Sequence, residues 1–177
     1  MKVALVSLNQ SWEDKEANRL KVRNCFQTIA FRNMDLVIFP EMTLTGFTMN
    51  VKEHAEEAEN SATIRFFTDC ACQYGVYIGF GMILKAGIKA ANHFIIVSPE
   101  GEMCADYIKI HPFSYAGEDR FYEKGKHLTS LEIQGVPIGL SICYDLRFPE
   151  IFQALSRTDK LILNIANWPE RRVLQIG

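Results

Sequence analysis

The sequence lacks a strong charge of either sign and lacks a long apolar run. Its 177 residues contain 19 Lys and Arg against 21 Asp and Glu, which gives a formal net charge of −2 at pH 7. A nearly balanced charge provides no electrostatic footprint for nucleic acid or for an acidic membrane surface. No apolar stretch approaches the roughly 20 residues that a membrane-spanning helix needs. We therefore expect no nucleic-acid partner and no membrane partner.

The sequence also lacks a signal peptide and the spacing of a metal site. Its start turns polar too quickly for a secretory signal and predicts a first strand instead. The five cysteines are an odd number at scattered positions, which favours reduced thiols and a cytoplasmic location. Cys70 and Cys72 are one residue apart and the four histidines lie far from one another, so we predict no metal site.

No internal repeat, low-complexity segment or linker divides the chain, so we expect residues 1–177 to form a single domain. Apolar residues make up 48% of the sequence, enough for a substantial core. The apolar patterns predict helices over residues 14–32, 62–74 and 149–156, and a long loop over residues 112–126. They predict strands over residues 2–8, 36–39, 76–84, 92–98, 103–110, 128–133, 136–142 and 161–165. This order indicates an α/β fold of mixed sheets with helices packed outside.

The most informative feature is Cys143, which lies in the run Ser-Ile-Cys-Tyr-Asp-Leu-Arg-Phe-Pro-Glu at residues 141–150. A predicted strand precedes this cysteine, and Pro149 is typical of the first turn of a helix. A thiol at a strand-to-helix turn has the geometry of a nucleophile elbow. The helix N-terminus favours negative charge, so we expect it to favour the thiolate. The alternative is that Cys143 is a small buried core residue.

Two charged residues occupy positions that match that of Cys143. Glu41 follows the predicted strand at residues 36–39, and Lys109 lies at the end of the one at residues 103–110. Sites in open α/β sheets gather outside the carboxyl ends of strands, so these three side chains could converge. Taken singly, Glu41 could be a solvated loop residue and Lys109 a surface charge.

Three segments resemble the three signatures of the nitrilase superfamily of carbon–nitrogen hydrolases, in the same order and at similar separations. They are Phe39–Phe47, Tyr107–His111 and Ile142–Glu150. The resemblance covers essentially the whole chain. It implies a four-layer α-β-β-α sandwich of the nitrilase type, and a homodimer or higher homo-oligomer in which two sandwiches pack together.

The resemblance also implies the chemistry. Glu41, Lys109 and Cys143 would be the catalytic triad, with Glu118 at the position of a second glutamate that orients Lys109 or the substrate. Cys143 would attack an amide carbonyl and form a thioester, with Glu41 as the general acid and base. Lys109 and a backbone N–H, that of Tyr144, would stabilise the oxyanion, and Lys109 would lower the thiol pKa. Such a mechanism requires no cofactor.

Within the superfamily, the residues after Cys143 and the segment Asn167–Pro169 look most like the ω-amidase branch. Its members hydrolyse the terminal amide of short 2-oxo acids such as 2-oxoglutaramate and 2-oxosuccinamate. Related alternatives are amidases for deaminated glutathione or for N-carbamoyl compounds. Nitrile hydrolysis is disfavoured, because the sequence after the cysteine lacks the tryptophan of those enzymes.

A small amide that carries a carboxylate needs a cation in its pocket, and Arg147 is the candidate. Arg147 could instead form an ion pair with Asp145 or Glu150, since a guanidinium suits both roles. Phe47, Trp168 and the Tyr144 ring could line the pocket. Phe47 and Trp168 could equally belong to the core, where aromatic side chains usually pack.

The resemblance implies a further helix and several strands after the Asn-Trp-Pro segment, and we expect these C-terminal elements to be missing. Their absence would leave unpaired strand edges, which invite aggregation or partner binding. An alternative expectation is therefore a truncated or split-gene subunit that is catalytically weak or inactive and needs a partner fragment.

Overall fold

The computed structural model describes residues 1–27 and 33–168, and its strands form two sheets. The larger sheet contains, in spatial order, β1 (Val3–Leu5), β2 (Leu36–Ile38), β3 (Tyr77–Ala86), β4 (Lys89–Val97) and β5 (Met103–Ile108), and β6 (Tyr122–Glu123) pairs with β4. The smaller sheet contains β7 (Ser130–Ile133), β8 (Val136–Ile142) and β9 (Leu161–Ile165). Each sheet includes parallel and antiparallel pairs, as predicted.

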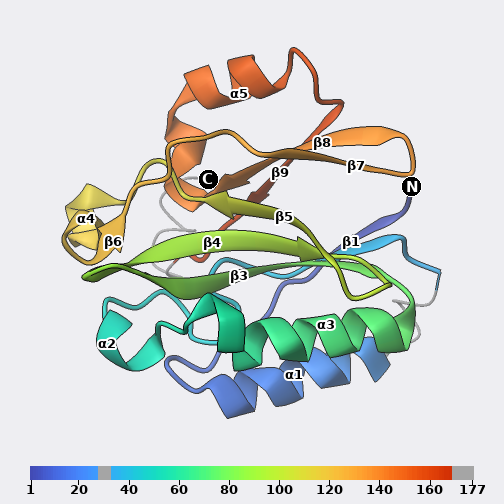
Figure 1. Ribbon diagram of the computed structural model, residues 1–177, viewed down its shortest axis with the longest axis horizontal. Helices are drawn as coiled ribbons and strands as arrows, with labels where there is room; N and C mark the ends of the chain where they lie inside the picture. Colours follow the sequence, from blue (N-terminus) through green and yellow to red (C-terminus); the bar gives the residue numbers. More distant parts are fainter. Residues whose placement is uncertain (28–32, 169–177) are drawn as a thin grey trace.

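The described helices are α1 (Lys15–Gln27), α2 (Val51–His54), α3 (Ala62–Tyr74), α4 (Glu118–Phe121) and α5 (Pro149–Leu155). Figure 1 shows α1 and α3 beneath the larger sheet, the smaller sheet above it, and α5 on the far side of the smaller sheet. The described elements thus stack as helices, sheet, sheet and helix.

Two apolar clusters hold these layers together. One joins α1 and α3 to the larger sheet through residues that include Val22, Phe67 and Ile78. The other lies between the two sheets, where Phe94 of β4 belongs to the same cluster as Leu140 of β8. Strand β2 and the second half of β4, residues 94–97, are continuously apolar because both of their faces are covered.

Local signals fix several of the predicted boundaries. Helix α3 starts where the Ser61 side chain accepts a hydrogen bond from the Ile64 N–H, and it ends at Gly75 in the left-handed conformation, with φ 63°. Gln134 and Gly135, both with positive φ, form the predicted turn between β7 and β8.

The segment predicted as a long loop over residues 112–126 is more ordered than expected. It contains a 3₁₀ turn (Ser114–Ala116), α4 and β6. The Tyr122 hydroxyl donates a hydrogen bond to the Thr48 carbonyl at 2.6 Å, which anchors β6 in the core. Tertiary contacts of this kind leave no local periodicity, so the sequence pattern could not reveal them.

Gly81 on β3 sets the position of the loop that follows β2. A Cβ atom at Gly81 would lie 2.4 Å from the Met42 backbone nitrogen and 2.7 Å from the Glu41 Cα. The Thr43 N–H donates to the Gly81 carbonyl at 2.8 Å, so the two backbones lie in direct contact. A glycine is needed here because any side chain would push Glu41 away from the sheet.

Some predictions fall partly outside the described residues. The predicted helix over residues 14–32 begins at Lys15, but its last five residues are not described. The chain beyond Trp168 is likewise outside the described part. No helix within residues 1–27 and 33–168 is long and apolar enough to cross a membrane.

Candidate active site

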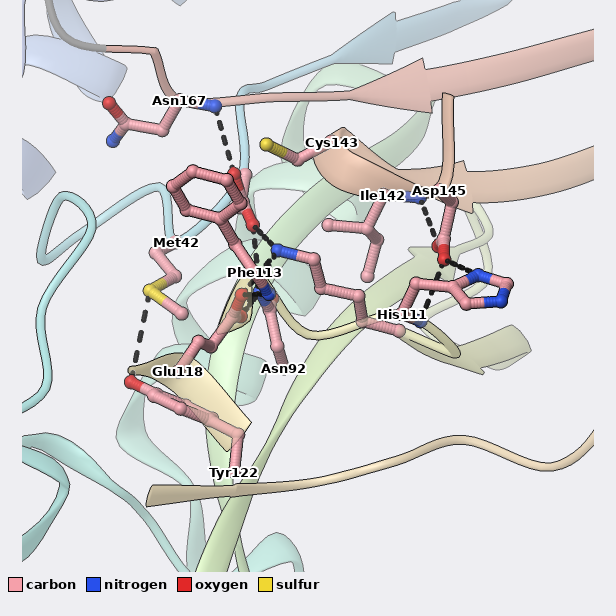
Figure 2. A network of polar contacts seen from close by, with 12 residues as sticks. Met42, Asn92, His111, Phe113, Glu118, Tyr122, Ile142, Cys143, Asp145 and Asn167 are labelled. Carbon is pink, nitrogen blue, oxygen red and sulfur yellow. Dashed lines mark hydrogen bonds and ion pairs between the residues drawn. The ribbon is translucent and has the colours of Figure 1, made fainter. Parts of the chain in front are cut away.

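Two of the three strand ends that were predicted to converge are joined directly by an ion pair. Glu41 follows β2, Lys109 follows β5 and Cys143 follows β8. The Lys109 Nζ atom lies 2.9 Å from Glu41 Oε1, and both side chains are buried, with 1% and 0% exposure. Figure 2 shows the polar network that surrounds this ion pair. A buried ammonium after β5 and a buried carboxylate after β2 satisfy one another's charge.

Glu118 completes the surroundings of the lysine, at the position predicted for a second glutamate. Its two carboxylate oxygens lie 3.1 and 2.9 Å from Lys109 Nζ, and it accepts the Phe113 backbone N–H. Asn92 on β4 donates through Nδ2 to Glu41 at 2.8 Å and to Glu118 at 3.2 Å. The amide of Asn92 therefore holds the two carboxylates on either side of one ammonium.

The charges in this network decide the protonation of Lys109. Burial lowers the pKa of Lys109, but the charges of Glu41 and Glu118 raise it more, so the net pKa lies above the ordinary value. Lys109 is therefore an ammonium throughout the physiological range. Burial raises the pKa of Glu118 despite the opposing effect of Lys109.

Cys143 lies at a strained turn directly after β8. It has φ 46°, which is uncommon for a residue other than glycine, and it begins the 3₁₀ turn Cys143–Arg147. This turn separates it from α5, so the thiol does not lie at the α5 N-terminus as the sequence suggested. The Trp168 indole N–H donates to its sulfur at 3.1 Å.

The predicted bias toward thiolate is not present. Burial raises the pKa of the Cys143 thiol, and the charge of Glu41 raises it further. Lys109 lowers that pKa, as expected, and so does Trp168, but the net pKa is raised to about 12. The resting form is a protonated thiol, so a base must remove its proton during attack.

Two of the predicted pocket aromatics contact catalytic candidates. The Lys109 Nζ atom lies 5.6 Å from the centroid of the half-buried Phe47 ring, which is within cation–π range. The indole N–H of Trp168 donates a hydrogen bond to the Cys143 sulfur. The Trp168 side chain also packs against the apolar cluster that lies between the two sheets. Trp168 therefore packs on the core, as one of the two alternatives expected, and it also contacts Cys143.

The other two predicted residues lie on the same turn as the cysteine. The Tyr144 ring packs edge-on against Phe113 and Phe148, with centroids 4.9 and 5.5 Å apart. Arg147 is exposed, and within residues 1–27 and 33–168 it forms no ion pair with Asp145 or Glu150. The structural role that the sequence allowed for Arg147 is therefore not observed.

Several polar residues of the site were not predicted. The Asn167 backbone N–H donates to Glu41 Oε2 at 2.9 Å, and its side chain donates to Gln10 at 2.6 Å. Gln10 in turn donates to the carbonyls of Met42 and Thr43 in the Glu41 loop. Asn92 could have been noticed as a polar residue in an apolar strand, whereas Gln10 has no comparable signal.

The described residues offer no obvious site for a metal. Within residues 1–27 and 33–168, no group of three His, Cys, Asp or Glu side chains could hold a metal ion. The functional groups that the strands bring together are a carboxylate pair, an ammonium and a thiol. This set contains a nucleophile, a base and a cation that can stabilise an oxyanion.

Residues 2–174 match a family model described as carbon–nitrogen hydrolase. The chain belongs to this family. The nitrilase-superfamily resemblance of its three motifs is thereby confirmed.

Two curated relatives have names that describe amidases. The chain is 33% identical over 172 residues to omega-amidase YafV of Yersinia enterocolitica. This match covers 97% of the present chain and 65% of that protein. It is 28% identical over 162 residues to the 2-oxoglutaramate amidase of Bacillus subtilis, with 90% and 62% covered. The chain therefore spans less than two thirds of the length of these relatives.

Solved structures share the fold. The crystal structure of XC1258 from Xanthomonas campestris, described as a CN-hydrolase superfamily protein with an arsenic adduct in the active site, matches with a TM-score of 0.87 and 28% identity. The match covers 98% of this chain and 67% of that one. A mutant of the Nesterenkonia AN1 amidase matches with a TM-score of 0.85 at 19% identity, which shows the same fold.

The raised thiol pKa predicts how fast Cys143 reacts with a simple alkylating reagent. Because the reactive form is the thiolate and the pKa is about 12, the rate with 2-chloroacetamide should rise about tenfold per pH unit from pH 7 to 10. Mass spectrometry of the peptide that contains Cys143 measures this rate. N-acetylcysteine is the reference, because its rate levels off near an ordinary thiol pKa. A Cys143 rate that levels off below pH 9 would contradict the arrangement of charges described above.

Proposed function

We propose that this chain carries the catalytic groups of an amidase that releases ammonia from a small, carboxylate-bearing amide of the 2-oxoglutaramate or 2-oxosuccinamate type. The observation that carries the proposal is the buried Lys109 ammonium, held between two carboxylates next to the Cys143 thiol. The names of the two amidase relatives support this class of substrate. We further propose that the protein acts as a homodimer or higher homo-oligomer.

In the first half of the proposed reaction, Glu41 removes the thiol proton as the Cys143 sulfur attacks the amide carbonyl carbon. A C–S bond forms, and the carbonyl oxygen becomes an oxyanion stabilised by the Lys109 ammonium and the Tyr144 backbone N–H. Protonated Glu41 then gives its proton to the leaving nitrogen. The C–N bond breaks, ammonia departs, and the acyl group remains on the sulfur as a thioester.

In the second half, Glu41 removes a proton from water, and the resulting oxygen nucleophile attacks the thioester. The C–S bond breaks, the carboxylic acid product leaves, and the sulfur recovers its proton from Glu41. One carboxylate thus serves as base and acid in both halves, which suits a group held by Asn92 and Asn167 rather than a mobile side chain.

The division of labour between the two glutamates follows from their partners. Glu118 bonds through both oxygens to Lys109 and also accepts the Phe113 N–H, whereas Glu41 contacts Lys109 through one oxygen only. Burial raises the pKa of the Cys143 thiol, and the charge of Glu41 raises it further, so Glu41 acts on that thiol. We assign proton transfer to Glu41 and orientation of Lys109 to Glu118.

Arg147 is the proposed partner of the substrate carboxylate. It is exposed and without an acidic partner among the described residues, and it lies on the turn that begins at Cys143. A guanidinium can bind a carboxylate through two parallel hydrogen bonds. Phe47, Tyr144 and Trp168 would then line the space between Arg147 and the catalytic groups.

Ammonia release tests the proposed reaction. The purified chain should release ammonia from 2-oxoglutaramate or 2-oxosuccinamate faster than from an N-carbamoyl amino acid or deaminated glutathione. The Cys143→Ala variant should lose activity by about a thousandfold or more, because the nucleophile is gone. The Cys104→Ala variant, which alters an exposed cysteine, should keep it.

Circular dichroism shows whether each sample is folded. A folded chain that releases no ammonia from any of these amides would contradict an independently active amidase. That outcome would favour the alternative in which this chain needs a complementary fragment. Faster ammonia release from deaminated glutathione or from the N-carbamoyl compound would support the proposed reaction but contradict the proposed class of substrate.

The proposed role of Arg147 predicts a change in KM rather than in kcat. The Arg147→Met variant should raise KM for 2-oxoglutaramate about tenfold to a hundredfold with kcat within about threefold, because the ion pair forms equally with substrate and transition state. Arg147→Lys should restore part of this binding. An unchanged KM in the folded Arg147→Met variant would contradict this role and show that another group binds the substrate carboxylate.

A further inference from the structure

A second buried carboxylate lies two residues after the cysteine and outside the catalytic network. Asp145 is fully buried, and its oxygens accept the Ile142 N–H at 3.1 Å, the Tyr107 hydroxyl at 2.7 Å and the His111 N–H at 2.9 Å. The His111 Nδ1 atom lies 3.0 Å from the same carboxylate. In the tautomer that carries a proton on Nδ1, this nitrogen donates to the carboxylate as well.

The donors to Asp145 come from two separate parts of the fold. Tyr107 and His111 lie two residues before and two residues after Lys109, at the end of β5 in the larger sheet. Ile142 is the last residue of β8 in the smaller sheet and directly precedes Cys143. Figure 2 shows Asp145 between His111 and Ile142. One carboxylate therefore ties the segment that carries the ammonium to the segment that carries the thiol.

The backbone at the cysteine needs such a tie. Cys143 has φ 46°, a conformation that persists in a residue with a side chain only where the surroundings enforce it. The Asp145 side chain enforces it from within the turn by holding the Ile142 N–H. The His111 ring adds a second contact across the same gap, since it stacks on Phe148 with centroids 3.5 Å apart.

We propose that Asp145 is a positioning residue, whose buried carboxylate keeps the Cys143 turn in place relative to Lys109 and Glu41. It touches neither the reacting atoms nor the proposed substrate. Without it, the turn relaxes and the sulfur moves away from both Glu41 and Lys109. Only the kinetic consequence of this displacement rests on the proposed amidase function.

The Asp145→Asn variant tests the proposal. One Asp145 oxygen faces the Ile142 N–H and the Tyr107 hydroxyl, and the other faces the backbone N–H and Nδ1 of His111. In the variant an NH₂ group replaces one of these oxygens, and that group cannot accept a hydrogen bond. Glu56→Gln is the matched control. Glu56 is another largely buried carboxylate that accepts several hydrogen bonds, from the side chains of Lys15 and Ser61 and from both the N–H and hydroxyl of Thr63. None of these partners belongs to the catalytic network.

The readout is the pH dependence of Cys143 alkylation by 2-chloroacetamide, which requires no enzymatic activity. In Asp145→Asn the rate should level off near pH 9, and at pH 8 it should exceed the wild-type rate at least tenfold, because the displaced thiol regains an ordinary pKa. Glu56→Gln should follow the wild-type profile. A folded Asp145→Asn variant with the wild-type profile, or the same change in Glu56→Gln, would overturn the proposal.

Tyr107→Phe provides a milder test if Asp145→Asn does not fold. It removes one of the donors to Asp145 and keeps the aromatic ring in the core. The proposal expects alkylation of Cys143 at pH 8 to rise at least threefold, and an unchanged rate would contradict it.

If the wild-type chain releases ammonia, kcat should fall at least tenfold in Asp145→Asn with KM within about twofold, and an unchanged kcat would overturn the proposal. Failure of the wild-type chain to release ammonia would refute the proposed function and leave the alkylation test in force.

Discussion

The buried ammonium of Lys109 is the constraint on which the site depends. A charge with 1% exposure is costly unless it is paired, and here the partners are Glu41 and Glu118. These two carboxylates come from the loop after β2 and from α4, so the ion pairs also fix the position of both segments relative to β5. The need to satisfy one cation thus explains why three distant parts of the chain meet at one point.

The same charges determine the chemistry that the site can perform. Glu41 neutralises Lys109 and also raises the pKa of the Cys143 thiol, so the lysine cannot by itself produce a resting thiolate. The Cys143 thiol therefore keeps its proton, and in the proposed reaction Glu41 removes it. Attack and proton transfer are expected to occur together, and the ammonium gains its full effect only when the carbonyl oxygen becomes negative.

The sequence predicted that Glu41 and Lys109 lie close together, but it did not predict most of the residues around them. Glu41, Lys109 and Cys143 each follow an apolar strand, which is a local pattern. The sequence could not pair Asn92 and Asn167 with Glu41, because they lie 51 and 126 residues away from it along the chain. Contacts between distant residues also explain α4. This helix lies in a segment predicted to be a loop, and it buries Glu118 against Lys109. The thiolate prediction was wrong because it did not consider that burial, and then the charge of Glu41, raise the pKa of the Cys143 thiol.

A covalent acyl group on Cys143 is the most direct test of this account. The chain is mixed with 2-oxoglutaramate, quenched in acid after milliseconds to seconds, and examined by intact-mass and peptide mass spectrometry. We predict an adduct with the mass of the acyl group on the peptide that contains Cys143, and none in Cys143→Ala. Ammonia release with an unmodified Cys143 at every quench time would contradict the thioester route.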